Sequence, residues 1–327
     1  MKKITIQHIA ERAGVSKGTV SRVFNAHPAV AGPTRRAVLE AMEELGYVPD
    51  LAARELSMRS EHTLGVTIDQ ADRRLSPYFV LFMQALSKRL QQAGISLVDL
   101  DGSLEGYRQL PSAVLVFGVR ESDPRLEVLG SREVPAILIG HQAEHAWVAP
   151  ADWEGAHQAT AHLIALGHRR IAHLSGFTQN QAFQDRYLGY YAALEEAGIA
   201  PKRHFVLDGA FNTIGGYRAV RRAWEQGLRF TGLFAASDEM AIGAIAALED
   251  LGVKVPWDVS VVGFDGLPSL PCALTTVEQD IPRIAATALE LALERIGGQP
   301  PRGVVVPVRL RVRETSARCL GPLEEEP

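Results

Sequence analysis

Cysteine is scarce in this chain: of its 327 residues only Cys272 and Cys319 are cysteines, and neither has neighbours at metal-ligand spacing. A sequence this poor in cysteine has no disulfide framework, which favours a reducing compartment. Apolar runs long enough to span a bilayer are also absent. The stretch from Met1 to Ile6 is basic but lacks the apolar core of a secretory signal. We therefore expect a cytoplasmic protein.

Motifs of several large enzyme classes are missing as well. The sequence contains no G-x-x-x-x-G-K phosphate loop, no G-x-G-x-x-G after a strand and no H-E-x-x-H zinc motif. Its ten histidines are scattered, and His157 and His162 are five residues apart, which places them off a common helical face. We expect no metal, no cofactor and no enzymatic activity.

Charge is divided unevenly along the chain. Residues 1–60 carry nine lysines and arginines against six acidic residues, a net charge of +3, whereas the remainder carries −7, which gives −4 overall. A basic segment attached to an acidic body is typical of a nucleic-acid-binding module joined to a second domain.

The segment AGVSKGTVSRVFN, residues 13–25, predicts a short turn followed by a helix. An apolar face over Ile6–Ala13 indicates a preceding helix, which Gly14 ends because glycine tolerates a left-handed backbone. Ser16 is placed to cap a second helix over Lys17–Phe24. The outward face of that helix holds short polar or cationic residues and no acid: Lys17, Gly18, Thr19, Ser21 and Arg22. Such a face fits a DNA groove, although an ordinary helical hairpin is the alternative.

From His62 onward, short apolar strands alternate with amphipathic helices. We expect strands over 63–68, 95–100, 113–117, 136–139, 171–174, 205–208, 232–235, 259–264 and 304–313. We expect helices over 77–93, 152–166, 185–197, 214–226, 238–251 and 282–296, besides a third amino-terminal helix over 34–45. This alternation makes parallel sheets with helices on both faces, and its length suffices for two lobes.

Polar residues that follow strands are the candidates for ligand contacts, because ligands bind beyond the carboxyl ends of such strands. Asp238 and Asp265 each follow a predicted strand, Arg186 lies near the start of a helix after a polar loop, and Ser76, Tyr78 and Phe79 follow the first strand. Carboxylates, a guanidinium and aromatic rings around one cleft suit a sugar or a nucleoside. For Asp238 a simple helix cap is an equally good interpretation.

One connection in the first lobe is short. Only residues 101–112 join two predicted strands, and their glycines and proline leave room for about one helical turn. Crossovers between parallel strands usually need a dozen or more residues including a helix. We expect the first lobe to be trimmed on one face.

Six motifs in this order resemble the LacI/GalR (lactose-repressor/galactose-repressor) family of transcription factors: AGVSKGTVSRVFN, ELGYVPDLAARELS, GHRRIA, SDEMAIGA, DVSVVGFD and LTTV. The resemblance implies an all-α helix-turn-helix DNA-binding head and an α/β periplasmic-binding-protein-like body of two doubly wound parallel-sheet lobes. The implied domains are a head (1–48), a hinge helix with linker (49–61) and a body (62–327). Lobe 1 is expected at about 62–150 and 277–298, and lobe 2 at about 151–276 and 299–318.

The resemblance also assigns residues of the head. Lys17, Gly18 and Arg22 match base-reading positions, next to the cap Ser16, and Leu56 matches a leucine wedged into the minor groove. Positions that fix the head on the phosphate backbone or flank the wedge are matched by Thr19, Ser21, Asn25, Tyr47, Ala53 and Arg54. Two departures are His8, where an acidic residue is usual, and Gly18, which has no side chain to read a base.

In the body, Arg186 and Asp238 match effector-contacting positions and Phe211 matches an aromatic that stacks on the ligand. Ser76, Tyr78 and Phe79 correspond to the ligand segment of the first lobe, and Asp265 to an aspartate near the site. Trp153 and Asn180 are further candidates near the cleft, or else pack within a lobe.

The function implied is that of a dimeric repressor. Two heads read a pseudo-palindromic operator, and a small molecule bound between the lobes, most simply a sugar, changes their spacing and so the affinity for DNA. A nucleoside or purine acting as co-repressor is the alternative within the family. A solute-binding protein or a sugar-processing enzyme would share the two lobes but not the basic head.

Overall fold

The computed structural model describes residues 6–24, 32–44, 62–68, 76–100, 102–120, 122–176, 181–268 and 270–321. These residues form two units, an amino-terminal head and a body that begins at Thr63. Among the described residues, no helix has the length and apolar character needed to cross a membrane.

Three helices make the head: α1 (Ile6–Ala13), α2 (Lys17–Phe24) and α3 (Gly32–Glu44). The first two have the predicted bounds, and α3 begins two residues before the predicted helix. They pack around a small core of Ile9, Ala10, Val20, Val23, Val38 and Ala41. With six buried apolar side chains, the amphipathic faces of the helices rather than their length hold this unit together.

The turn between α1 and α2 has the predicted chemistry. Gly14 has φ +64°, and the amide of Val15 donates to the carbonyl of Ala10 at 3.0 Å, which closes the end of α1. Ser16 caps α2, because its Oγ accepts from the amide of Thr19 at 3.1 Å.

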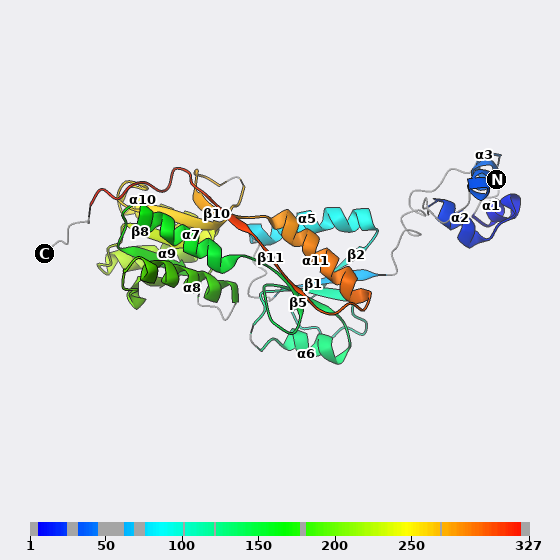
Figure 1. Cartoon of the computed structure of the whole chain (residues 1–327), viewed down its shortest axis with the longest axis horizontal. Helices are drawn as coiled ribbons and strands as arrows, with labels where there is room; N and C mark the ends of the chain where they lie inside the picture. The colour runs from blue at the N-terminus through cyan, green and yellow to red at the C-terminus, as the bar shows by residue number, and fades with distance from the viewer. Residues whose placement is uncertain are drawn as a thin grey trace. The chain divides into compact units, whose positions relative to one another are not determined.

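Lobe 1 of the body is a six-stranded sheet in the order β11-β5-β4-β3-β1-β2. Its strands are β1 (Thr63–Thr67), β2 (Ser96–Leu100), β3 (Ala113–Phe117), β4 (Ala136–Ile139), β5 (Ala146–Pro150) and β11 (Gly303–Val306). Helices α5 (Pro77–Ala93) and α11 (Ile281–Ile296) lie above this sheet in Figure 1, and α6 (Pro124–Ser131) lies below it. Helices on both faces are what a parallel sheet requires to bury its apolar residues.

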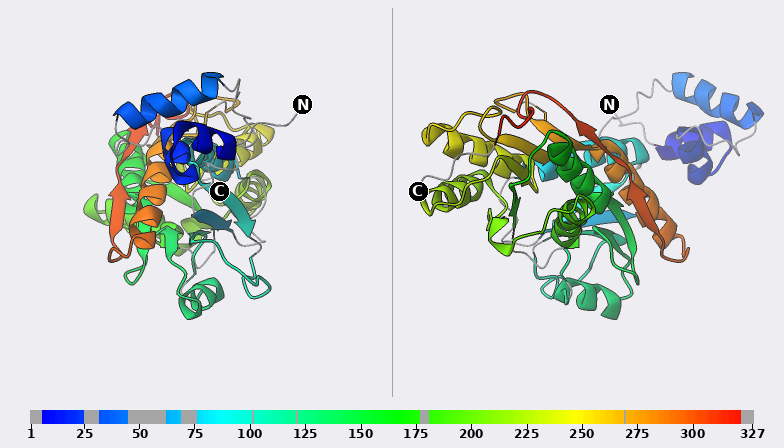
Figure 2. Two further views of the ribbon diagram at one scale, coloured as in Figure 1. Left: turned by 90° about the vertical axis from the view of Figure 1, so that its right-hand side faces the viewer. Right: turned by 60° about the vertical axis from the view of Figure 1, so that its left-hand side comes forward.

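Lobe 2 repeats this arrangement with the strand order β12-β10-β9-β8-β6-β7. Its strands are β6 (Ile171–Ser175), β7 (Val206–Asp208), β8 (Gly232–Ala235), β9 (Ser260–Asp265), β10 (Thr275–Gln279) and β12 (Val308–Arg311), the last antiparallel to β10. Its helices are α7 (Asp152–Ala165), α8 (Gln181–Glu196), α9 (Thr213–Glu225) and α10 (Asp238–Asp250), and a short 3-10 turn, η1, covers Arg203–Phe205. One apolar cluster includes residues of α9 and α10, and a second includes residues of α7 and α8. Helices lie on both sides of this sheet (Figure 2).

The chain passes between the lobes three times, and two of these crossings differ from the prediction. All of β10 pairs in lobe 2, whereas α11 and β11 belong to lobe 1, so the predicted boundaries at 276/277 and 298/299 move to about 280 and 307. The sequence predicts a single strand over 304–313, but the structure has two, β11 in the sheet of lobe 1 and β12 in the sheet of lobe 2. Pro307 separates them, since it has no amide hydrogen to donate to a sheet.

The short connection in lobe 1 behaves as predicted: its described residues, 102–112, contain no helix. Leu104 is buried, and Tyr107 and Leu110 pack against the apolar cluster on the lower face of the lobe 1 sheet. Irregular backbone therefore covers surface that a crossover helix would otherwise cover.

Helices α7 and α8 pack at a distance that only glycine allows at one position. A Cβ on Gly189 would clash with the main-chain carbonyl oxygen of Trp153 and lie 3.0 Å from the amide nitrogen of His157. Backbone atoms in two packed helices cannot yield as a flexible side chain can.

We expect Gly189→Ala to lower the free energy of unfolding of the body by about 1–3 kcal/mol, because the helices must separate. Thermal or urea unfolding followed by circular dichroism measures this. The matched control is Gly130→Ala in α6, where an added Cβ meets nothing within 4 Å, and we expect that variant to be as stable as the wild type or slightly more so. Equal stability of the two variants would contradict the packing argument.

Candidate ligand cavity and nucleic-acid interface

A cavity of about 230 Å³ lies between the two lobes. Lobe 1 contributes mostly apolar lining from the carboxyl ends of β1, β3 and β4 and from the start of α5: Ile68, Ser76, Tyr78, Phe79, Phe117, Gly118, Ile139 and Gly140. Lobe 2 contributes the charged lining, with Asp152, Arg186, Glu239, Asp265 and Gln279 beside Phe183, Phe211 and Asn212. This is the edge of the sheets at which ligands of doubly wound folds bind.

Arg186 is the centre of the polar wall. The side chain is 5% exposed, and its Nε donates to Asp152 Oδ1 at 2.7 Å while one terminal nitrogen donates to the carbonyl of Ala236 at 2.5 Å. The same nitrogen is 3.8 Å from Asp265 Oδ1, and the guanidinium carbon lies 3.7 Å from the ring centre of Phe264. Burial alone would lower the pKa of Arg186, but the two carboxylates outweigh it and raise that pKa.

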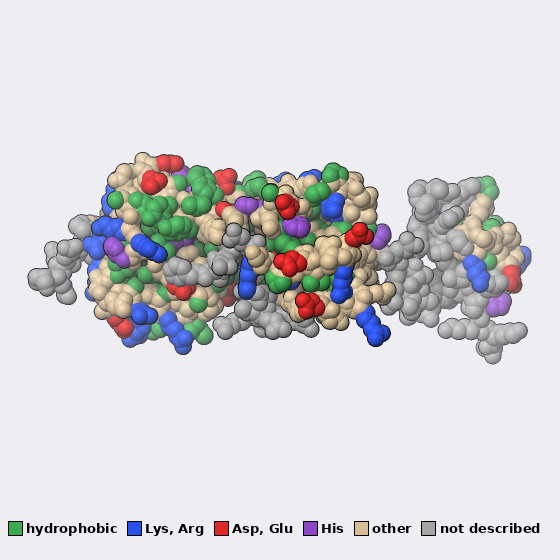
Figure 3. Space-filling model, turned by 90° about the horizontal axis from the view of Figure 1, so that it is seen from below, with side chains coloured by type: hydrophobic (Ala, Val, Ile, Leu, Met, Phe, Trp, Pro, Cys, Tyr) green, Lys and Arg blue, Asp and Glu red, His purple; other side chains and the backbone are tan. Residues whose placement is uncertain are grey.

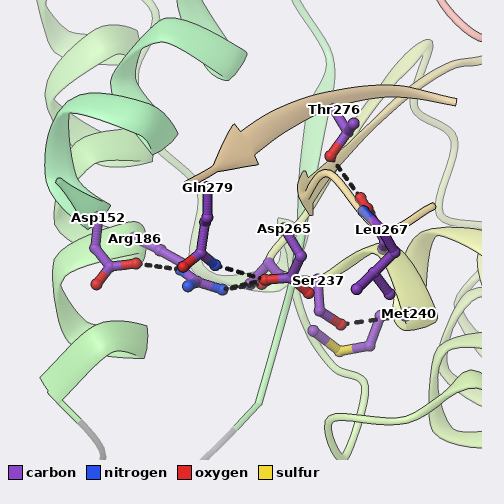
Figure 4. A network of polar contacts seen from close by, with 10 residues as sticks. Asp152, Arg186, Ser237, Met240, Asp265, Leu267, Thr276 and Gln279 are labelled. Carbon is purple, nitrogen blue, oxygen red and sulfur yellow. Dashed lines mark hydrogen bonds and ion pairs between the residues drawn. The ribbon is translucent and has the colours of Figure 1, made fainter. Parts of the chain in front are cut away.

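Asp265 sits opposite Arg186 in a strained backbone. Its φ of +128° falls where L-residues are rare, and its Oδ1 accepts from Gln279 Nε2 at 2.8 Å (Figure 4). Burial raises the pKa of Asp265 well above its usual range, against the opposing effect of Arg186. Ala210 and Phe211, which also line the cavity, have φ of +44° and +54°. Strain of this kind gathers at functional sites.

Gln279 adds an acceptor at the same end of the cavity. Its Nε2 is held by Asp265, while its buried Oε1 has no hydrogen-bond partner. A buried carbonyl oxygen without a donor costs free energy, which a ligand N–H or O–H could recover once the lobes rearrange.

The apolar walls carry one aromatic pair from each lobe. Phe79 and Phe117 meet edge to face with ring centres 5.1 Å apart, and Phe183 and Phe211 do so at 4.1 Å. Tyr78 is half-buried near them, and burial together with the charges of Asp265 and Asp152 raises its pKa. The Tyr78 hydroxyl therefore stays protonated and able to donate.

Most of the predicted ligand residues meet at this cavity. Ser76, Tyr78, Phe79, Arg186, Phe211 and Asp265 all line it. Trp153 does not line it: it is 39% exposed on α7 and stacks on His157 in lobe 2. Asn180 lies outside the described residues.

Asp238 is neither the ligand contact nor the helix cap that the sequence predicts. It is fully buried and is not part of the cavity lining, and Ser237, not Asp238, caps α10. Its Oδ2 accepts from the amide of Leu267 at 2.7 Å and its Oδ1 from the hydroxyl of Thr276 at 2.5 Å. Both oxygens thus hold β10 and the loop after β9 to the start of α10. Because the side chain is fully buried and does not line the cavity, neither oxygen is in reach of a ligand there.

Asp152 and Gln279 were missed by sequence reasoning because the strands before them were missed. Asp152 follows β5 and Gln279 ends β10, so the rule that ligand residues follow strands would have found both. The apolar pattern does not predict the strand β10 (TTVEQ), because Thr275 and Thr276 are polar. Both are nevertheless fully buried, and each is hydrogen-bonded through its hydroxyl.

The predicted DNA-contacting residues are only partly described. Ser16 and Lys17 are exposed at the start of α2, and Thr19, half-buried, is hydrogen-bonded to Ser16. The surroundings of Gly18 and the side chains of Ser21 and Arg22 are not described. Five further predicted residues lie wholly outside the described residues: Asn25, Tyr47, Ala53, Arg54 and Leu56. On the face of the body seen in Figure 3, acidic and basic side chains are interspersed, in contrast to the net positive charge of residues 1–60.

Comparison with known proteins supports both units. Residues 5–50 match the family model described as bacterial regulatory proteins, lacI family, and residues 160–316 match a periplasmic binding protein-like domain. The HTH-type transcriptional repressor PurR of Pectobacterium carotovorum is 31% identical over 336 residues, which cover 97% of this chain and 98% of that protein.

Two solved structures are similar over nearly the whole chain. The complex of the transcriptional regulator CelR with cellobiose has a TM-score of 0.73 at 30% identity and covers 96% of this chain and 100% of its own. The lac repressor dimer bound to operator and the anti-inducer ONPF has a TM-score of 0.75 at 27% identity, with 97% and 100% covered.

We expect Asp238→Ala to destabilise the body by about 2–4 kcal/mol, because two buried donors, the Leu267 amide and the Thr276 hydroxyl, lose their acceptor. Denaturant unfolding measures the change. A variant of wild-type stability that has lost its response to ligand would contradict this assignment and restore Asp238 as a ligand contact.

Proposed function

The chain belongs to the lacI family of bacterial regulatory proteins and is a DNA-binding transcriptional repressor, and we propose that a neutral, polyhydroxylated molecule of the sugar class is its effector. The observation that carries this proposal is the composition of the polar wall, in which one guanidinium is outnumbered by carboxylates.

The charge of the cavity argues against an anionic effector. Among the described lining residues Arg186 is the one cation, against Asp152, Asp265 and Glu239, and its Nε and one terminal nitrogen are already bonded within the protein. A phosphate or carboxylate group would find only the remaining N–H groups of this one guanidinium and would approach three acids. Hydroxyl groups, in contrast, can donate to the carboxylates and to Gln279 Oε1.

The aromatic pairs complete the match to a sugar ring. Phe79 with Phe117 and Phe183 with Phe211 offer apolar surface to the C–H faces of a ring whose hydroxyls point toward Arg186 and its carboxylates. The cellobiose bound to the CelR relative supports the same class. A flat purine or nucleoside could use these rings too, and binding measurements separate the two.

For the head, we propose that α2 enters the major groove with Lys17, Gly18 and Arg22 toward the bases, and that two copies of the chain bind as a homodimer to a pseudo-palindromic operator. The capped turn before α2 and the lac repressor dimer–operator relative support this.

A ligand screen tests the effector class. We expect neutral mono- and disaccharides to include at least one compound that raises the thermal unfolding temperature of the body, whereas the corresponding sugar phosphates leave it unchanged. The control is Asp265→Ala, which removes one acid of the polar wall and should abolish the shift. Stabilisation by a purine or a sugar phosphate, but by no neutral sugar, would refute the proposal.

Arg22→Ala tests the recognition helix. We expect the difference in binding free energy between the correct and the wrong base pair at one operator position to fall by about 1–3 kcal/mol, because a bidentate contact to guanine is removed. The body should remain folded. Fluorescence anisotropy with single-base operator variants measures this. Arg12→Ala is the control: Arg12 pairs with Glu44 at 2.5 Å within the head, so its loss should leave base discrimination intact. Equal discrimination by Arg22→Ala and wild type would remove the assignment.

A further inference from the structure

A side-chain contact joins the lobes across the rim of the cavity. His141, after β4 in lobe 1, places its Nε2 2.6 Å from Asp185 Oδ2 on α8 of lobe 2. This contact lies next to the cavity, since Gly140 and Arg186, the sequence neighbours of His141 and Asp185, line it.

Both members of the His141–Asp185 pair are held in place from within their own lobes. The other carboxylate oxygen of Asp185, Oδ1, accepts from Gln181 Nε2 at 3.0 Å, one turn earlier on α8. The ring of His141 packs on Trp147 of β5 with ring centres 5.5 Å apart. Side chains restrained in this way lose little further rotamer entropy when they meet, so the pair is stronger than two free surface groups would be.

The pair is set among other charges of the site. The pair lies at the edge of the polar wall, because Arg186, which follows Asp185 in the chain, and Asp152 both line the cavity. The carboxylate of Asp185 only accepts, so His141 donates through Nε2–H whether its ring is neutral or charged. Any rotation that opens the cavity on this side must separate His141 from Asp185.

We propose that His141 and Asp185 form a latch between the lobes that sets how often the ligand-free protein occupies the closed arrangement. The latch rests on the proposed function in that the cavity holds the effector. A residue pair that favours the closed state raises the affinity for a ligand that needs this state, and it shifts operator affinity in the same direction as the ligand does.

The chain contains a matched control for this pair. His157 Nε2 lies 2.8 Å from Glu196 Oε2, so it has the same chemistry, but α7 and α8 both belong to lobe 2. Breaking this second pair removes an equivalent hydrogen bond and changes nothing between the lobes.

A double-mutant cycle on the full-length protein tests the latch. The variants are His141→Phe, which keeps a ring against Trp147, Asp185→Ala and the double variant, beside the control cycle of His157→Phe and Glu196→Ala. Operator affinity of the ligand-free protein is measured by fluorescence anisotropy. Affinity for the sugar that the thermal screen identifies is measured by calorimetry. Circular dichroism checks that each variant is folded.

We expect each latch variant to weaken sugar binding about fivefold and the double variant to be no weaker than the single ones, because either change breaks the same contact. Operator affinity without ligand should change by a similar factor, in the direction opposite to that caused by the sugar, and the control cycle should change neither. Additive effects in the double variant, or latch variants within twofold of wild type in both measurements, would overturn the latch. Because operator affinity requires no ligand, it still tests the latch if every sugar fails to bind, an outcome that refutes only the proposed effector class.

Discussion

A single buried cation constrains the second lobe. The guanidinium of Arg186 lies out of water between α7, α8 and the ends of β8 and β9, and a charge in that position is tolerated only when its hydrogen bonds are made. Asp152 supplies one acceptor from the start of α7 and the carbonyl of Ala236 supplies another from the end of β8. The orientation of these elements is therefore fixed by the hydrogen bonds of one side chain, which also lines the cavity.

This arrangement separates the tasks of the two lobes. Lobe 2 carries the charged groups and holds them with contacts made within the protein, whereas lobe 1 offers mainly aromatic and aliphatic surface. A preorganised polar wall fixes the orientation of a ligand without paying for reorganisation at binding. The apolar wall can then close over it, since apolar contacts are not directional and accept small rotations.

Periodicity in the sequence was enough to predict the helical head and most strands and helices of both lobes. Positions after strands and loops then gave five of the residues that line the cavity, and the family resemblance added Phe211. The sequence pattern gave wrong predictions where polar residues are buried. The strand β10 is rich in threonine, yet Thr275 and Thr276 are fully buried, so its pattern does not resemble an apolar strand. Asp238 shows the converse: its position after a strand is that of a ligand residue, but its two acceptors are used by Leu267 and Thr276, which only tertiary structure reveals.

The segments that join the lobes suit a protein that must move between states of nearly equal free energy. At two of the three crossings the chain runs side by side, with the amide of Ala151 donating to the carbonyl of Val306 at 2.9 Å, so a small rotation there need not break a sheet. A strong contact across the cavity would hold the lobes closed at every ligand concentration and abolish the response. A ligand can shift the equilibrium only by its differential affinity, typically 1–3 kcal/mol between coupled sites. A single partly exposed pair such as His141–Asp185, worth about 1 kcal/mol or less, is of the right size to bias that equilibrium without fixing it.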